Sequence, residues 1–243
     1  MYKAKELMDL VCENGTEKLK RRIISVFIAS ILGGLFIGLG YLGYLYLAFG
    51  PFGNKFFGSL IFATGLVMII IGGADLFTGN CLLTFGVLSR RYSFGKMGLY
   101  LLLVWIGNFV GAFLLALMVK FANVDQIMPE IIALSKMKIN LSFWEAFFRG
   151  VLCNILVAMA VYMAGAAKNV SGKILACILP VSLFVVSGFE HSVANMFLLP
   201  LGSINGGDFS FLNTFINLIP VTLGNFFGGG ILLPGAYYLI YKK

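Results

Sequence analysis

The chain has 243 residues, of which 60% are hydrophobic and 12% are charged, and its formal net charge is +8. A soluble domain carries about 25% charged residues, so this composition excludes an ordinary soluble protein and indicates an integral membrane protein. The basic excess follows membrane topology, as described below, and does not indicate a nucleic-acid partner.

A short amphipathic segment begins the chain, within residues 1–20. Ala4, Leu7, Met8 and Val11 fall on one helical face, opposite polar and charged residues. This pattern predicts a helix that lies on the membrane surface, with a frayed tail as the alternative. No short apolar region with a small-residue cleavage site is present, so we expect no cleaved signal peptide.

The apolar segments that follow predict the membrane spans. A spanning helix needs about 20 mainly apolar residues, and windows of this length predict six spans in one membrane domain that covers residues 1–243. The predicted spans are residues 23–49, 56–88, 98–121, 143–167, 174–201 and 211–241.

Basic residues concentrate on one side of this topology. With the N-terminus inside, the basic residues on that side are Lys3, Lys5, Lys18, Lys20, Arg21, Arg22, Arg90, Arg91, Lys96, Lys168, Lys173, Lys242 and Lys243, and those on the other side are Lys55, Lys120, Lys136, Lys138 and Arg149. Cytoplasmic loops are enriched in Lys and Arg, so both termini are predicted to be cytoplasmic and the protein to span the cytoplasmic membrane.

The second and fifth spans are each interrupted near the middle by polar residues. Both breaks contain a glycine, an acid and an asparagine at the same spacing: Gly73, Asp75 and Asn80 in one, and Gly188, Glu190 and Asn195 in the other. The third and sixth spans also share a Gly-Asn-Phe-x-Gly pattern, at residues 107–111 and 224–228. This order predicts two repeats of three spans, which must have opposite orientations because three is odd.

The fold class predicted is therefore an all-α membrane protein with two inverted three-helix repeats and broken second and fifth helices. Transport proteins of this kind place their sites near the midplane, where non-helical backbone is buried or lines a cavity. We expect Asn108 and Asn225 to hold the broken loops. Asp75 and Glu190 are expected to accept backbone N–H groups in those loops, and the repeated glycines to allow close helix packing.

His191, the only histidine, lies in the fifth-span break. Ionisable groups at that depth are costly and mark transport pathways or binding sites by default. With an unperturbed pKa of about 6.5, a histidine can donate a hydrogen bond or transfer a proton. A purely structural histidine is the alternative, but the depth, the adjacent Glu190 and the matching break favour function.

Other chemistry is not indicated. One histidine makes a zinc site hard to assemble, and we find no HExxH, GxSxG or phosphate-binding glycine motif. A membrane enzyme that uses Asp75, Glu190 and His191 is thus a remote alternative, and no cofactor or metal is expected. Without metal spacing, we interpret four residues as reduced packing cysteines, Cys12, Cys81, Cys153 and Cys177.

Three segments carry a resemblance to a known family. They are residues 74–80 (ADLFTGN), Lys138 followed by residues 143–154 (FWEAFFRGVLCN), and residues 180–197 (PVSLFVVSGFEHSVANMF). Across essentially the whole chain, the sequence resembles the formate/nitrite transporter family, most closely its hydrosulfide channel branch. The resemblance implies an aquaporin-like fold, a homopentamer, a pore in each protomer, and small monovalent anions such as hydrosulfide, formate or nitrite as substrates.

The resemblance also implies roles for individual residues. His191 is the central pore histidine, Thr78 its hydroxyl partner, and Lys138 the residue that attracts anions. Asp75, Asn80, Glu190 and Asn195 structure the two loops. The apolar constrictions are Phe62, Leu66, Leu76 and Phe184.

In the expected mechanism, an anion attracted by Lys138 loses most of its water at one apolar ring and then meets His191 and Thr78. Proton-coupled formate or nitrite transport stays open, because His191 could protonate a weak-acid anion. An aquaporin-type channel for neutral solutes is disfavoured, since neither Asn80 nor Asn195 is followed by proline.

Overall fold

Long apolar runs form the helices that build this fold. The computed structural model describes residues 2, 4–51, 53–123 and 126–241, so that Lys3, Lys242 and Lys243, counted above for topology, lie outside the described residues. The elements are α1 (Ala4–Lys18), α2 (Ile23–Phe49), α3 (Lys55–Gly72), α4 (Phe77–Asn80), η1 (Cys81–Leu83), α5 (Thr84–Leu88), α6 (Phe94–Phe121), α7 (Met128–Ile139), α8 (Phe143–Ala166), α9 (Val170–Val186), α10 (Ser192–Ile204), α11 (Phe211–Phe226), the π-helical η2 (Phe227–Leu232) and α12 (Leu233–Tyr241).

The predicted second and fifth spans are broken helices. The second consists of α3 and the short elements α4, η1 and α5, and the fifth of α9 and α10. Gly73 and Gly188 lie just after the first part of each span with φ of +74° and +67°. Glycine adopts this left-handed conformation without a Cβ penalty, so both residues allow the chain to turn back into the membrane. Among the described residues, five helical segments are each long and apolar enough to span a membrane. The broken helix formed by α9 and α10 supplies the remaining predicted span.

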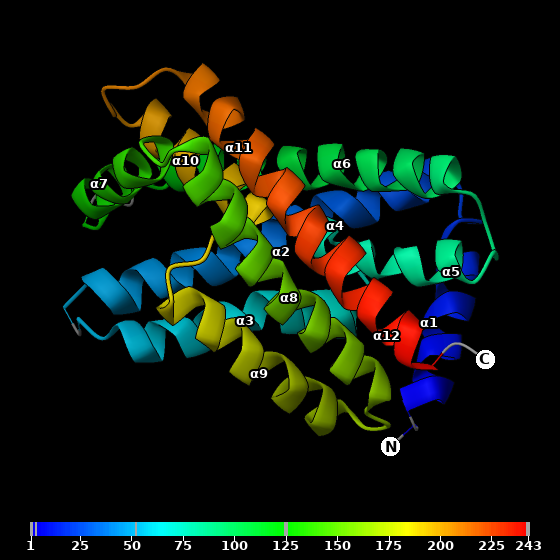
Figure 1. Cartoon of the computed structure of the whole chain (residues 1–243). Helices are drawn as coiled ribbons and strands as arrows, with labels where there is room; N and C mark the ends of the chain where they lie inside the picture. The colour runs from blue at the N-terminus through cyan, green and yellow to red at the C-terminus, as the bar shows by residue number, and fades with distance from the viewer. Residues whose placement is uncertain (1, 3, 52, 124–125, 242–243) are drawn as a thin grey trace.

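The two halves repeat the same packing (Figure 1). In the first half α2 packs against α3 and α6, and in the second half α8 packs against α9 and α11. The second part of each broken helix packs against the other half, α10 against α6 and α4 against α8. This exchange joins the halves and places both breaks at the centre of the molecule.

The repeated glycines lie where helix backbones touch. A Cβ at Gly224 would overlap the carbonyl oxygen of Phe147, and one at Gly111 would overlap that of Ile31. Their predicted role in helix packing is confirmed, because α8 and α11, like α2 and α6, approach too closely for any side chain at these positions.

Replacing Gly224 by alanine should therefore destabilise the protein by about 1–3 kcal/mol, since α8 and α11 must separate to admit the methyl group. A lower midpoint of thermal unfolding in detergent would show it. Gly98→Ala is the matched control, because a Cβ there meets nothing within 4 Å. Equal midpoints for the two variants would contradict this reading of the packing.

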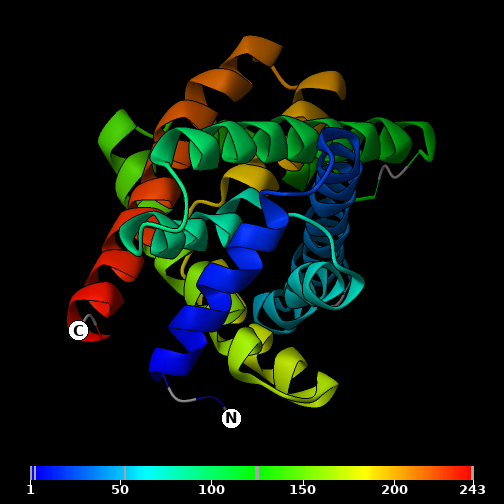
Figure 2. The same ribbon diagram turned by 90° about the vertical axis from the view of Figure 1, so that its right-hand side faces the viewer.

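The N-terminal helix α1 packs on protein and does not turn its apolar face to lipid. Leu7, Met8 and Cys12 are buried in a cluster with Phe85 of α5 and Tyr162 of α8. Figure 2 shows α1, in blue, lying across one end of the bundle. The helix is formed as expected at this position, and α5 and α8 offer its buried residues a protein surface.

Helix α7 was not predicted and lies at the opposite end from α1 (Figure 1). Its buried residues Met128 and Ile131 join the main core, and the helix packs against α10 and α11. Lys136 and Lys138, which lie between the predicted third and fourth spans, are both on its last turn.

Candidate functional site: a polar pair between two cavities

The two broken helices meet at a buried hydrogen bond. The Oγ1 atom of Thr78, in the first turn of α4, lies 3.0 Å from Nε2 of His191, which immediately precedes α10. Thr78 is fully buried and His191 is 2% exposed. Residues distant in the sequence are thus brought together from opposite repeats.

The tautomer of His191 follows from its second contact. The backbone N–H of Ala194 donates to Nδ1 at 3.1 Å. Because a backbone N–H can only donate, Nδ1 must be the acceptor, so the neutral imidazole carries its hydrogen on Nε2. Nε2–H then donates to the Thr78 oxygen, and the hydroxyl hydrogen of Thr78 is directed elsewhere.

Asp75, in the first break, is held by several side chains. Its carboxylate pairs with Lys18 at 2.7 Å and Arg21 at 2.6 Å. Asn80 and Tyr100 each donate to it at 3.1 Å. The basic residues that end α1 and precede α2 therefore fix the loop between α3 and α4.

Glu190 holds the corresponding position in the second break. It pairs with Lys138 at 2.7 Å and accepts from Nδ2 of Asn195 at 2.7 Å. Both acids thus accept from cationic and amide side chains, and the expectation that they accept backbone N–H groups was wrong. A buried carboxylate without a counter-charge is strongly destabilising, and the cationic side chains supply that counter-charge.

Asn108 holds the first loop, as predicted. Its Oδ1 accepts from the backbone N–H of Phe77 at 2.9 Å. Its Nδ2 donates to the carbonyls of Ser30 and Asp75 at 2.7 and 2.8 Å. One amide therefore satisfies three backbone groups at the helix break.

Asn225 repeats this arrangement in the second loop. Its Oδ1 accepts from Ser192 N–H at 2.9 Å, and its Nδ2 donates to the carbonyls of Gly150 and Glu190 at 2.8 and 2.9 Å. The role predicted for Asn108 and Asn225 is confirmed, and the pseudo-symmetry extends to individual hydrogen bonds.

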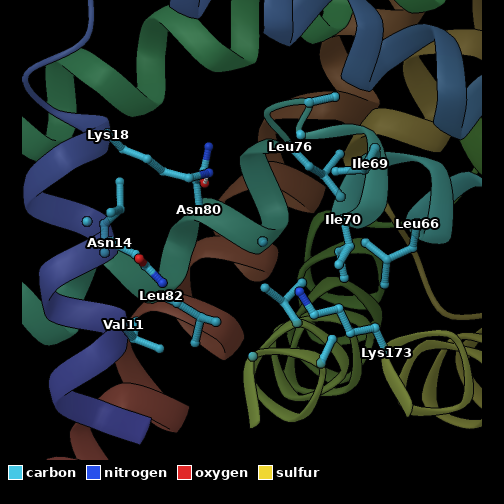
Figure 3. Close-up of a pocket in the computed structure, with 18 of the residues that line it drawn as sticks. Val11, Asn14, Lys18, Leu66, Ile69, Ile70, Leu76, Asn80, Leu82 and Lys173 are labelled. Carbon is cyan, nitrogen blue, oxygen red and sulfur yellow. Dashed lines mark hydrogen bonds between the residues drawn. The ribbon is translucent and has the colours of Figure 1, made fainter. Parts of the chain in front are cut away.

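A cavity of about 290 Å³ lies beside α1, and we call it the α1 cavity. In Figure 3, Lys18 and Asn80 lie on one side of it, Leu66 and Leu76 on the other, and Lys173 at its lower edge. Gly79, the neighbour of Thr78, also lines it, so this cavity extends from α1 to the residue next to the central pair.

A second cavity, of about 300 Å³, lies beside α7 and is called the α7 cavity. His191 lines it together with Phe62, Phe184 and Lys138. The ring of Phe184 stacks on His191, with centroids 5.7 Å apart, and meets Phe62 edge-on at 5.5 Å. This cavity reaches the central pair from the α7 end.

The four predicted constriction residues do not form one ring. Leu66 and Leu76 line the α1 cavity, whereas Phe62 and Phe184 line the α7 cavity. The single ring expected before His191 is therefore divided between the two cavities, and the pair in the α7 cavity combines Phe62 of the first repeat with Phe184 of the second.

Lys138, which was expected to attract anions, lines the α7 cavity as one half of a buried ion pair. Its side chain is 12% exposed and is paired with Glu190, which is 2% exposed. Lys136, two residues earlier, pairs instead with Asp208 at the surface.

We predict that Lys138→Met lowers stability by about 3–5 kcal/mol, because it leaves the buried Glu190 carboxylate without its counter-charge. Lys136→Met should leave the unfolding midpoint unchanged, since the pair it removes is exposed to water. Unfolding in detergent measures both, and a Lys138 variant as stable as the Lys136 variant would rule out the buried pair.

Several site residues were not singled out from the sequence. Lys18 and Arg21 were counted only for topology, and Tyr100 was not considered. Asn217 accepts from Asn195 at 2.8 Å and donates to the Lys138 carbonyl at 2.8 Å. An asparagine within the apolar sixth span was the available signal for this residue. Among the residues described, no group of three or more potential metal ligands occurs.

Two inverted repeats, two broken helices that meet at a buried polar pair, and a cavity at each end define a multi-pass membrane transport protein. The chain belongs to the formate/nitrite transporter family, whose model, described as formate/nitrite transporter, matches residues 5–239. Family membership confirms the predicted family and the prediction that the chain is a transport protein and not an enzyme.

Related proteins are similar over nearly their full length. The chain is 33% identical to formate channel FocA of Escherichia coli (strain K12), covering 95% of this chain and 91% of that protein. It is 37% identical to a probable formate transporter of Methanothermobacter thermautotrophicus, with 93% and 92% covered.

Solved structures confirm the fold class. An FNT family ion channel matches with a TM-score of 0.90 at 28% identity, covering 97% of this chain and 98% of that chain. A pentameric formate channel with formate bound matches with a TM-score of 0.79 at 32% identity, covering 91% and 98%.

Proposed function

We propose that this protein is a homopentameric channel in which each protomer conducts small monovalent anions across the cytoplasmic membrane. Hydrosulfide is the substrate favoured by the sequence, and formate and nitrite are the alternatives. The buried Thr78–His191 hydrogen bond between two cavities carries the proposal. Similarity to formate channels and to a pentameric formate channel supports the anion class and the assembly.

The orientation proposed places both termini in the cytoplasm, on the basis of the lysines and arginines described above. The α1 cavity then opens toward the cytoplasm and the α7 cavity toward the outside. An anion passes one apolar constriction, meets the central pair, and leaves through the other.

Thr78 is the proposed donor to the anion. Since its oxygen accepts Nε2–H of His191, its hydroxyl hydrogen is free to point at a permeating ion. The apolar constrictions remove water from the ion, and a single donor counts for more in this low-dielectric region. Binding by a neutral donor is also weak enough to allow release, as conduction requires.

Hydrogen bonding at Nδ1 argues against proton transfer by His191. To protonate an anion, the ring would first have to carry hydrogens on both nitrogens. The Nδ1 hydrogen would then face the N–H of Ala194, which donates to that atom at 3.1 Å. Two opposed donors are unfavourable in a buried site, which supports anion conduction over proton-coupled transport.

Proteoliposome uptake of hydrosulfide, formate, nitrite and chloride tests the proposal. Uptake of at least one of the first three above that of empty liposomes, with slower chloride uptake, is the expected result. No uptake of any anion would overturn the proposed function. Chloride uptake as fast as that of the best substrate would overturn selection by dehydration at the constrictions.

A further inference from the structure

The charged residues that line the α7 cavity contribute unequally to the electrostatic field that a passing ion experiences. The charged groups are Lys138, Glu190 and Arg149. Lys138 and Glu190 are in contact at 2.7 Å, with exposures of 12% and 2%. Opposite charges this close cancel at longer range, so the pair contributes almost no net field at the mouth of the cavity.

Arg149 differs from Lys138 in both exposure and partners. It is exposed, lines the cavity, and makes no ion pair with any described residue. Glu145, one helical turn earlier, interacts electrostatically with Arg149 but makes no ion pair with it and does not line the cavity, and its Oε2 accepts from the N–H and hydroxyl of Ser142 at 2.9 and 2.8 Å. The cavity's net charge of +1 is thus carried by Arg149.

The backbone at this position is also fixed beside the pore. The carbonyl of Arg149 accepts from the N–H of Glu190 at 3.3 Å. The Arg149 backbone is therefore bonded directly to the loop that carries His191, and its side chain lines the same cavity as His191.

The α1 cavity carries more net positive charge than the α7 cavity. Lys18 and Arg21 share the single carboxylate of Asp75. Lys173 lines the same cavity and makes no ion pair with a described residue. Its net charge is +2, so removal of one cation leaves it positive, whereas removal of Arg149 leaves the α7 cavity neutral.

We propose that Arg149, and not Lys138, supplies the electrostatic attraction that concentrates anions in the α7 cavity. The inference rests on the proposed anion conduction. A cleft with one sign of charge and low-dielectric walls raises the local concentration of counter-ions and the rate at which they associate, and this effect weakens with salt.

The test is the initial rate of formate influx into proteoliposomes at pH 7, with Arg149→Gln beside wild type. At an ionic strength of about 0.01 M, where the Debye length is about 30 Å, the variant should be roughly threefold slower. At about 1 M, where the Debye length is about 3 Å, the two rates should converge. Lys173→Gln should show a smaller loss at low salt, because the α1 cavity stays positive.

The charge at position 149 can also be changed by chemical modification after the protein has folded. The four native cysteines are buried, so Arg149→Cys offers a single accessible thiol. Modification with a cationic thiol reagent should restore the wild-type rate, and an anionic reagent should slow influx further.

Equal rates for Arg149→Gln and wild type at low salt, or the same loss at both salt concentrations, would overturn the role of Arg149. So would equal effects of the two thiol reagents. Absence of formate, hydrosulfide and nitrite flux in the wild type would instead overturn the proposed function, so the two failures are distinguishable.

Discussion

Replacing His191 by asparagine is expected to reduce anion flux roughly tenfold, which corresponds to about 1.4 kcal/mol in the barrier and to the loss of one buried hydrogen bond. The asparagine oxygen can replace Nδ1 as acceptor for the Ala194 N–H, since asparagine is a good N-cap residue. Its shorter side chain cannot replace Nε2–H, so the Thr78 hydroxyl loses its orientation.

Flux into proteoliposomes and thermal unfolding measured on the same preparation check this prediction. The unfolding midpoint should stay close to the wild-type value, because the cap on α10 is kept. A variant with wild-type stability and wild-type flux would show that His191 is only a structural residue.

The second large effect is expected at Asn225. Asn225→Leu keeps the branching and number of side-chain heavy atoms but removes the hydrogen-bond partner of the Ser192 N–H and of the carbonyls of Gly150 and Glu190. Each unpaired buried group costs about 1–3 kcal/mol, so the variant should lose several kcal/mol of stability and nearly all flux.

Asn205→Leu is the matched control for this substitution. Asn205 lies at the end of α10 and donates one hydrogen bond, to the Leu201 carbonyl at 2.8 Å. Its loss should lower the unfolding midpoint only slightly and leave flux unchanged. Similar midpoints for the Asn205 and Asn225 variants would contradict the role assigned to the repeated asparagines.

The spans and breaks could be predicted because they depend on local composition and spacing. Apolar windows located the spans, and the matched positions of Asp75 and Glu190 revealed the repeat. The glycine pattern at residues 107–111 and 224–228 also predicted close packing between helices, since only small residues allow helix backbones to touch.

The ion-pair partners of Asp75 and Glu190 could not be predicted from the sequence, because they are set by tertiary contacts. Nothing local indicated that Asp75 pairs with Lys18 and Arg21, or that Glu190 neutralises Lys138. The same limit explains the N-terminal helix, whose amphipathic pattern suits a membrane surface and a protein surface equally well.

Departures from regular α-helix could not be predicted from the sequence either. The sixth span changes to π-helix at residues 227–232, where Gly228, Gly229 and Gly230 are buried. A Cβ at Gly229 would overlap the side chain of Asn154, which donates to the Thr78 carbonyl at 3.2 Å. The segment therefore lies against the residue that supports the first loop.

The central claim is that Thr78 and His191 act as one unit on the permeating ion. A double-mutant cycle of formate influx with Thr78→Val, His191→Asn and both together tests it most directly. If the claim holds, each single variant is roughly tenfold slower than wild type and the double variant is no slower than either. Losses that multiply in the double variant, or a single variant that conducts like wild type, would contradict it.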